Sequence, residues 1–300
     1  MLGSALDKFK SIVTRNSSFI QNKLASGMSD GRVEKLLFAP KNRNKAVARA
    51  PKGFRIETIR TSAGNVNAYL TGSGPIVVFV HGWKGQAYQF LPLMRGLDRC
   101  GFTSIAFEHI GYGQSEARPT TLKQSIETTN EVLTHIRKSS GEAFAALVGH
   151  STGCLSIVNA RQGLIKDVPL FLISPVFNYK LYFLRRLVSL KLHPDVLKQY
   201  AAKFGQVYKK EYQSLELGQH LKKYADIAVI AHDETDKETK VADSIQFCDQ
   251  HPLTRLLITK QFDHDLIINS ESVWQELKST LNYDDTTINF SDTIITSFSE

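Results

Sequence analysis

The sequence predicts an α/β protein whose mostly parallel central sheet is covered by helices on both faces. Short apolar segments recur along the chain, and helical segments such as residues 122–139 separate them. Apolar segments without alternation indicate strands that are buried on both faces, and strands that alternate with helices join through right-handed crossovers into a parallel sheet. The predicted strands of this kind are IVVFV (76–80), SIAF (104–107), FAALV (144–148), LFLIS (170–174), IAVIA (227–231) and RLLIT (255–259).

The sheet is expected to begin with an antiparallel pair. FRIETIR (54–60) and VNAYL (66–70) alternate apolar and polar residues, which is typical of half-buried strands. We therefore predict one α/β domain over residues 53–283, preceded by a basic helix and linker (1–52) and followed by a tail (284–300). Within the domain, residues 178–223 carry no strand pattern and are predicted to form a helical insertion rich in aromatic and basic residues.

The net charge of +8 is concentrated at the start of the chain. Residues 1–60 hold 13 Lys and Arg against 4 Asp and Glu, whereas residues 61–300 hold 24 against 25. The nearly neutral body argues against nucleic acid as a partner. Two interpretations of the basic segment remain open, namely contact with an anionic membrane surface and packing on the flank of the domain with a solvated basic face. We expect the second.

Other features of the composition indicate a soluble cytoplasmic protein. No segment approaches the 18 or so apolar residues that a membrane span requires, and the N-terminus lacks the apolar core of a secretory signal. The three cysteines are too few and too scattered for a disulfide framework or a metal cluster. They are expected to be small buried side chains.

The strongest functional signal is the segment FAALVGHSTG, in which Gly149-x-Ser151-x-Gly153 follows a strand and precedes a helix. This context is typical of a nucleophile elbow, a tight turn whose strained backbone exposes the serine hydroxyl above the edge of the sheet. The flanking glycines allow the neighbouring strand and helix to approach without a Cβ clash. We therefore predict that Ser151 is a nucleophile.

A serine needs a general base and a group that orients the base, because its hydroxyl is protonated near neutral pH. Catalytic groups of a parallel sheet lie beyond the carboxyl ends of the strands. His264 follows the strand RLLIT directly and is the predicted base. The loop after IAVIA offers the carboxylates of Asp233, Glu234 and Asp236, so an acid is expected beside His264.

From about residue 54 to residue 282 the chain resembles the α/β-hydrolase fold family, in particular its esterase-like and lipase-like branch. The motifs that carry the resemblance are HGWKG, GYGQS, GHSTG, HDETD and FDHD, each shortly after a predicted strand. The resemblance implies an oxyanion hole formed by the backbone N–H groups of Trp83 and Thr152. It also implies structural roles for His81 and Gly82, and it favours Asp236 over Asp233 as the acid that orients His264.

The chain departs from the family pattern at three positions. Asp233 replaces the glycine of the H-G-x-x-D motif, Asp263 precedes the catalytic histidine where a glycine is common, and Glu108 stands where the D-x-x-G-x-G-x-S turn has aspartate. Two other histidines at strand ends, His109 and His232, are alternatives to His264 as the base, and His150 is expected to pack beside the sheet.

The predicted activity is cleavage of a carboxylic ester through a Ser151–His264–Asp236 triad and an acyl-enzyme, with no metal or organic cofactor. Serine at the elbow argues against the epoxide hydrolase and haloalkane dehalogenase branches, whose nucleophile is an aspartate. Two alternatives remain: thioester cleavage or acyl transfer by the same triad, and a non-catalytic binding protein of the same fold. The expected partner is a small acyl ester. The resemblance implies that residues 178–223 form a cap over the nucleophile, where their aromatic side chains either line an acyl pocket or pack the cap helices.

Overall fold

The computed structural model describes Leu37 and residues 50–283, so the predicted N-terminal helix and C-terminal tail lie outside the described residues. The described chain divides into two compact units. The larger comprises residues 50–177 and 217–283, and the smaller comprises Leu37 and residues 178–216. None of the helices in the described part combines the length and the apolar character that a membrane span requires.

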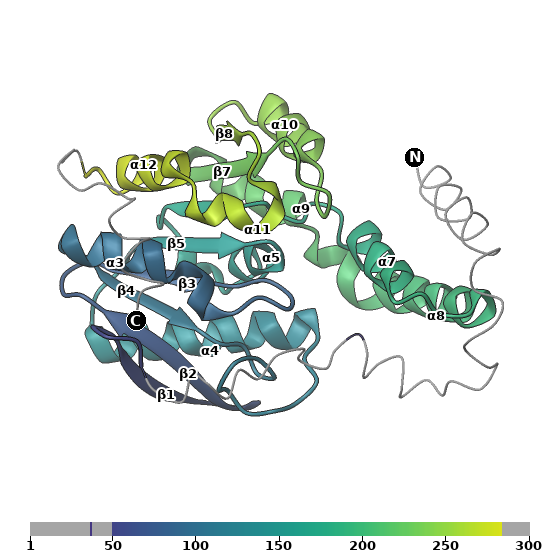
Figure 1. The fold of residues 1–300 in the computed structure, drawn as a ribbon, viewed down its shortest axis with the longest axis horizontal. Coiled ribbons are helices and arrows are strands. Elements are labelled where there is room, and N and C mark those ends of the chain that lie inside the picture. The colour runs from purple at the N-terminus through teal and green to yellow at the C-terminus, as the bar shows by residue number, and fades with distance from the viewer. Residues whose placement is uncertain (1–36, 38–49, 284–300) are drawn as a thin grey trace. The chain divides into compact units, whose positions relative to one another are not determined.

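The larger unit is built on a single eight-stranded sheet within the described residues, with the strand order β1-β2-β4-β3-β5-β6-β7-β8 (Figure 1). β2 pairs antiparallel with β1 and β4, and all the other neighbours are parallel. The predicted fold class is therefore confirmed. The strands are β1 (Arg55–Thr61), β2 (Gly64–Thr71), β3 (Ile76–Val80), β4 (Thr103–Phe107), β5 (Phe144–His150), β6 (Leu170–Ile173), β7 (Ala228–Asp233) and β8 (Arg255–Thr259).

Each predicted strand is present, and β3 and β8 have the predicted bounds. The continuous apolar segments of β3 and β6 are buried at every residue, as expected for strands covered on both faces. β6 ends one residue early because Ser174 takes a φ of 47°, which is incompatible with extended backbone. β7 continues to Asp233, so the carboxylate of Asp233 stands at the very end of the strand.

Helices cover both faces of the sheet. α3 (Leu91–Arg99) and α12 (Glu271–Thr280) pack on one face, where alternate strand residues such as Val77 and Phe79 complete the core. These helices can approach closely because Gly96 has no side chain. A Cβ at this position would lie 2.7 Å from the ring of Trp274. α4 (Leu122–Ser140) contacts β1 and α5 (Thr152–Val158) on the other face.

The remaining elements of the larger unit are short connections apart from α10, which packs against β7 and β8. They are η2 (Ala87–Phe90), α6 (Gln162–Ile165), α9 (Leu217–Leu221), η5 (Lys222–Ile227), α10 (Val241–Gln250), α11 (Asp263–Leu266) and η6 (Ile267–Asn269).

The smaller unit is a helical hairpin. α7 (Tyr179–Ser189) begins where the Asn178 side chain accepts from the Leu181 N–H at 2.8 Å, and α8 (Pro194–Val207) begins with a proline. The rings of Phe183 and Phe204 stack at 3.7 Å between the two helices. A π-helical turn η3 (Tyr208–Tyr212) and the 3-10 turn η4 (Gln213–Leu215) complete the unit.

The helical insertion was predicted to extend to about residue 223, whereas the smaller unit ends at Glu216. α9 and η5 belong to the larger unit, and α9 contacts α5 there. The aromatic side chains of the insertion contact one another, as Tyr179 does with Tyr212 at 5.4 Å. This packing favours a structural role for these rings, and the cap over the nucleophile stays a prediction.

Candidate active site

Ser151 lies in the tight turn between β5 and α5. Its backbone takes φ 56° and ψ −121°, a conformation that a residue with a Cβ adopts only under strain, and its N–H donates to the Ile173 carbonyl at 2.9 Å. A Cβ at Gly153 would lie 2.1 Å from the Val80 carbonyl oxygen, and a Cβ at Gly149 would lie 2.9 Å from the Cys154 nitrogen. The two glycines therefore permit the close packing of α5 on β3 and β5.

His264 lies in α11, directly beyond β8, and is hydrogen bonded to Ser151. The distance from His264 Nε2 to Ser151 Oγ is 3.0 Å, and both residues are buried. His150 donates its Nε2–H to the His264 carbonyl at 2.8 Å, and its Nδ1 accepts from the Gln89 amide at 3.2 Å. His150 therefore holds the backbone of His264 in place, a role that its position in the sequence did not indicate.

Asp236 is the carboxylate that contacts His264. Its Oδ2 accepts from His264 Nδ1 at 2.8 Å, which fixes the tautomer that leaves Nε2 free to accept from Ser151. The side chain of Asp236 is fully buried, and its Oδ1 accepts from the N–H groups of Glu238 and Thr239. Burial acts to raise the pKa of Asp236, but hydrogen bonds from His232 and His264 outweigh it and hold the pKa well below its usual range.

Asp233, the alternative acid, has a different role. Its Oδ2 accepts from the Thr259 hydroxyl at 2.7 Å and from the Phe262 N–H at 3.1 Å, and its Oδ1 accepts from the Thr235 hydroxyl at 2.6 Å. These bonds connect the end of β7 to the end of β8 and to the loop before His264. Asp233 thus ties together the two loops that carry Asp236 and His264.

His232 and Thr239 also contact the Asp236 carboxylate, and the sequence did not assign them this role. His232 Nε2 lies 3.3 Å from Asp236 Oδ2, its Nδ1 accepts from the Ser244 hydroxyl at 2.8 Å, and its side chain is fully buried. The Thr239 hydroxyl donates to the same Oδ2 at 2.7 Å. The H-D-E-T-D pattern places His232 four residues before Asp236, but nothing in it shows that both side chains face inward.

The predicted oxyanion-hole residues lie next to each other. The Trp83 N–H donates to the side-chain hydroxyl of Thr152 at 2.7 Å. A Cβ at Gly82 would lie 2.7 Å from the Ser151 Cβ and 3.2 Å from the Thr152 nitrogen, so the Gly82–Trp83 backbone lies directly against the elbow. The two residues predicted to supply the N–H donors are brought together, and the Trp83 N–H already donates to the hydroxyl oxygen of Thr152.

Beneath this loop lies a buried cluster of ionisable side chains. The His81 Nδ1–H donates to the Gly82 carbonyl at 2.8 Å, and Nε2 accepts from the His109 N–H at 3.0 Å. Burial lowers the pKa of His81 to about 4 in spite of the bond to Gly82. Burial raises the pKa of Glu108 to about 8, although the Ala87 N–H, which donates at 3.1 Å, opposes the shift. Burial therefore favours the neutral form of both side chains, and no hydrogen bond joins His81 or His109 to Ser151 in the described structure.

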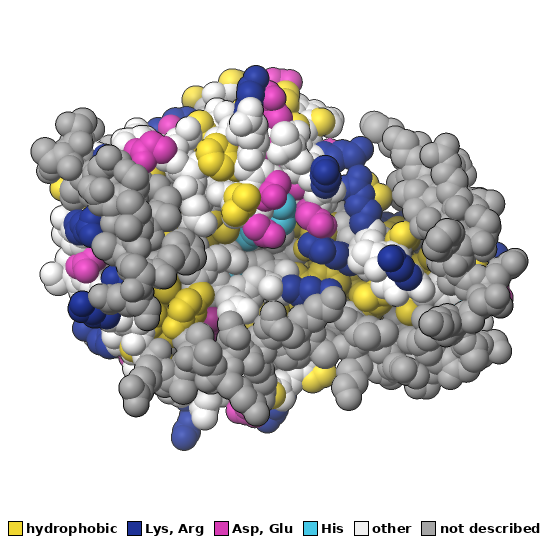
Figure 2. Space-filling view, viewed as in Figure 1, with side chains coloured by type: hydrophobic (Ala, Val, Ile, Leu, Met, Phe, Trp, Pro, Cys, Tyr) yellow, Lys and Arg dark blue, Asp and Glu magenta, His cyan; other side chains and the backbone are white. Residues whose placement is uncertain are grey.

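Asp263 takes a φ of 56°, the left-handed region that favours glycine. Aspartate tolerates this region because its short side chain bonds locally, and here Oδ1 accepts from the N–H groups of Asp265 and Leu266. The side chains of Asp263 and Asp265 are exposed on either side of His264. Figure 2 shows acidic side chains gathered around exposed histidine atoms in the middle of the face, where Figure 1 places α11.

Among the described residues, His150, His264 and Asp265 form a group of potential metal ligands whose atoms lie within 4.8 Å of one another. Both ring nitrogens of His150 already have hydrogen-bond partners, and His264 Nε2 faces Ser151. A metal ion here would have to replace the contacts that hold His264, so the donor set does not fit a metal centre.

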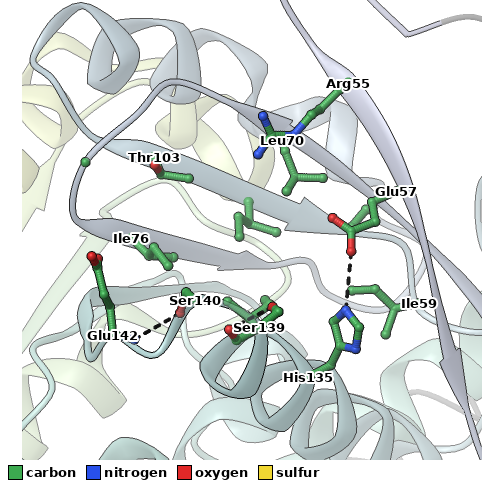
Figure 3. A pocket seen from close by; sticks show the side chains of 14 residues that line it. Arg55, Glu57, Ile59, Leu70, Ile76, Thr103, His135, Ser139, Ser140 and Glu142 are labelled. Carbon is green, nitrogen blue, oxygen red and sulfur yellow. Dashed lines mark hydrogen bonds and ion pairs between the residues drawn. The ribbon is translucent and has the colours of Figure 1, made fainter.

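A cavity of about 300 Å³ lies elsewhere in the larger unit, between α4 and the sheet (Figure 3). Ile76 and Thr103 begin β3 and β4, so the cavity opens at the amino ends of these parallel strands. Its rim includes the His135–Glu57 pair at 3.3 Å. None of its lining residues belongs to the Ser151, His264 and Asp236 group.

Comparison with known proteins supports the class that the fold defines. A family model for the alpha/beta hydrolase fold matches residues 75–160, a segment that includes the HGWKG loop and the elbow. The chain has the α/β-hydrolase fold.

Three matches illustrate what the chain is similar to. It is 36% identical over 96 residues to 2-(acetamidomethylene)succinate hydrolase of Mesorhizobium japonicum, covering 32% of this chain and 33% of that protein. It is 30% identical over 112 residues to an epoxide hydrolase of Caballeronia sordidicola, covering 36% of this chain and 33% of that protein. The esterase Est1E of Butyrivibrio proteoclasticus, in complex with ferulic acid, has a TM-score of 0.58 at 18% identity, covering 75% of this chain and 99% of that one.

These comparisons differ in what they cover. The sequence matches span about a third of the length of the curated relatives. The structural match spans nearly the whole of the esterase, and at 18% identity it concerns the fold alone. The relatives are hydrolases of more than one kind, so the choice among reactions depends on the side chains of the site.

Proposed function

We propose that this chain is a serine hydrolase that cleaves a carboxylic ester through an acyl-enzyme. The observation that carries the proposal is the continuous hydrogen-bonded chain Ser151 Oγ to His264 Nε2 (3.0 Å) and His264 Nδ1 to Asp236 Oδ2 (2.8 Å). Such a chain lets His264 take the serine proton as the hydroxyl attacks a carbonyl, while the Asp236 carboxylate stabilises the imidazolium.

The reaction then has two halves. Ser151 Oγ bonds to the carbonyl carbon, and the carbonyl electron pair moves to oxygen, which accepts from the N–H groups of Trp83 and Thr152. The tetrahedral intermediate collapses as His264 returns the proton to the leaving alcohol. Water, deprotonated by His264, releases the acid and restores Ser151.

Epoxide hydrolysis is the competing reaction, because an epoxide hydrolase is among the matched relatives. An epoxide opened by an aspartate becomes an ester, which water cleaves, whereas one opened by Ser151 would become an unactivated ether that a His–Asp pair does not hydrolyse. The elbow serine therefore favours acyl chemistry.

The charges around His264 constrain the substrate class. Asp263 and Asp265 are exposed on either side of this residue and add negative potential at the rim of the site. We infer that neutral esters are preferred over esters that carry a carboxylate next to the scissile carbonyl. Thioesters without such a charge remain compatible with the same triad.

A fluorophosphonate probe and a panel of p-nitrophenyl esters of increasing acyl length test the proposal. The probe is expected to label the wild-type protein and not Ser151→Ala, and Ser151→Ala is expected to lose ester turnover. Addition of an alcohol or thiol acceptor separates hydrolysis from acyl transfer, since a transferase forms the new ester at the expense of the free acid. Turnover of an epoxide by a wild-type protein that is inert to both reagents would overturn the proposal.

A further inference from the structure

The side-chain hydroxyl of Thr152 contacts one of the predicted donors of the oxyanion hole. Thr152 is expected to contribute its backbone N–H, as the residue after the nucleophile. The structure adds that its Oγ1 lies 2.7 Å from the Trp83 nitrogen and accepts from the Trp83 N–H. This N–H is the other predicted donor to the substrate oxygen, so the hydroxyl lies beside the predicted hole.

The backbone holds this hydroxyl in position. Thr152 is the first residue of α5 and is 8% exposed, and the Gly82 backbone lies against it and against Ser151. Threonine is branched at Cβ, so few χ1 rotamers are open to it at the start of a helix. The hydroxyl therefore points to the Gly82–Trp83 backbone. Fixing this short side chain costs less conformational entropy than fixing a longer one would.

The proton of this hydroxyl has no acceptor among residues 50–283. Oγ1 accepts from Trp83, and the structure shows no bond that the Thr152 hydroxyl donates within the described chain. Two threonines inside α4 behave differently, because the hydroxyls of Thr129 and Thr134 donate to the carbonyls four residues earlier at 2.8 and 2.6 Å. Thr152 thus has an O–H group to donate where a substrate oxygen is expected.

We propose that the Thr152 hydroxyl is a third oxyanion donor, which makes Thr152 a catalytic residue through its side chain as well as its backbone. This inference rests on the proposed serine hydrolase function. As negative charge develops on the substrate oxygen, it accepts from the Thr152 N–H and the Thr152 O–H, and the Trp83 N–H shares its single proton between this oxygen and Oγ1 in a three-centre bond. The threonine keeps its proton throughout, and the only proton transfers are those of Ser151, His264, the leaving group and water.

The same contact explains how the hole is prepared before substrate binds. The hydroxyl accepts from the Trp83 N–H and so holds the Gly82–Trp83 backbone against the elbow, beside the position of the oxyanion. A donor that is held in place in the resting enzyme does not have to reorganise during the reaction, and this is the main source of oxyanion-hole catalysis.

Thr152→Val keeps the shape of the side chain and removes its hydroxyl. We expect kcat on a p-nitrophenyl ester to fall about 100-fold, the effect of losing one oxyanion donor, with little change in KM. Thr152→Ser restores the hydroxyl and is expected to recover most of the loss. Thr129→Val, which removes a buried hydroxyl of α4 outside the site, is the matched control for a general effect of the substitution and should turn over normally.

The rate at which the fluorophosphonate labels Ser151 separates this inference from the proposed function. The phosphoryl oxygen uses the same donors, so labelling of Thr152→Val should be slower than labelling of the wild-type protein by a similar factor. If the wild-type protein is labelled and Thr152→Val reacts at the same rate or faster, the hydroxyl only fills the empty hole and the inference is wrong. If the wild-type protein is neither labelled nor active on esters, the proposed function fails together with the inference. Urea unfolding of each variant establishes that the fold is retained.

Discussion

His232 and His264 contact the same oxygen atom of Asp236 from two sides, at 3.3 and 2.8 Å respectively. Both histidines and the carboxylate are buried, so these contacts are little screened by water. With the Thr239 hydroxyl, these histidines make three donors on one oxygen, which stabilise the ionised carboxylate and fix its orientation. The buried His232 ring therefore acts on Ser151 indirectly, through the position of Asp236.

His232→Phe keeps a ring and removes the donor to Asp236. A hydrogen bond to a charged group contributes about 1.5–3 kcal/mol, so we expect kcat to fall about 10-fold to 100-fold if this energy is used to orient the triad. His232→Gln, whose amide can donate near the position of Nε2, should recover part of the activity. His135→Phe, which removes a histidine beside Glu57 at the distant cavity, is the matched control. Equal kcat in all variants would show that His232 is only structural.

Asp236→Asn is expected to affect mainly catalysis and Asp233→Asn mainly stability. Asp236→Asn removes the acceptor of the His264 Nδ1–H, and loss of a triad acid lowers kcat by about 10⁴-fold. Asp233→Asn weakens the bonds to Thr259 and Phe262, so the main loss should be about 1–3 kcal/mol of unfolding free energy. Steady-state kinetics and urea unfolding on both variants test the assignment. A larger kcat loss in Asp233→Asn than in Asp236→Asn would reverse it.

The sequence was sufficient to predict the sheet because its strands are continuous apolar segments bounded by turns. All eight predicted strands are present, and Ser151, His264 and Asp236 come together because each follows a parallel strand whose carboxyl end lies at the same edge of the sheet. Position along the chain therefore predicts proximity for residues directly after a strand.

Contacts that depend on side-chain direction could not be predicted. His150, His232 and Thr239 lie near strand ends like many other polar residues, and only the folded backbone shows that they face His264 or Asp236. The left-handed Asp263 is a similar case, because aspartate rather than glycine obscured the conformation that this loop requires. The helical insertion was predicted to extend to about residue 223 because α9 continues the helical pattern beyond Glu216.

Glu108→Gln is expected to stabilise the protein at alkaline pH. Burial raises the pKa of Glu108 to about 8 from an ordinary value of 4.5, so the folded state binds a proton that the unfolded chain has lost. The contribution of the neutral carboxyl is complete below pH 4.5 and is lost as the pH rises to about 8. Glutamine is neutral at every pH, so the Tm of Glu108→Gln should exceed that of the wild-type protein by about 3 °C or more at pH 9. The difference should shrink toward pH 5, and a constant difference across this range would contradict the prediction.

Gly153→Ala and Gly163→Ala test the packing beneath Ser151. A Cβ at Gly153 would lie 2.1 Å from the Val80 carbonyl oxygen and 2.8 Å from the His81 carbonyl oxygen, and both are backbone atoms that cannot rotate away. α5 would have to move from β3, which would displace the Thr152 N–H and Ser151 together. We expect Gly153→Ala to lose solubility or at least 3 kcal/mol of unfolding free energy, about the largest cost of overpacking a core.

Gly163 lies in α6 with nothing within 4 Å of its added Cβ, so Gly163→Ala should be neutral or stabilising by up to about 1 kcal/mol. Urea unfolding and fluorophosphonate labelling of both variants give the comparison, and a Gly153→Ala protein with wild-type stability and labelling would show that the close approach of α5 to β3 is not required.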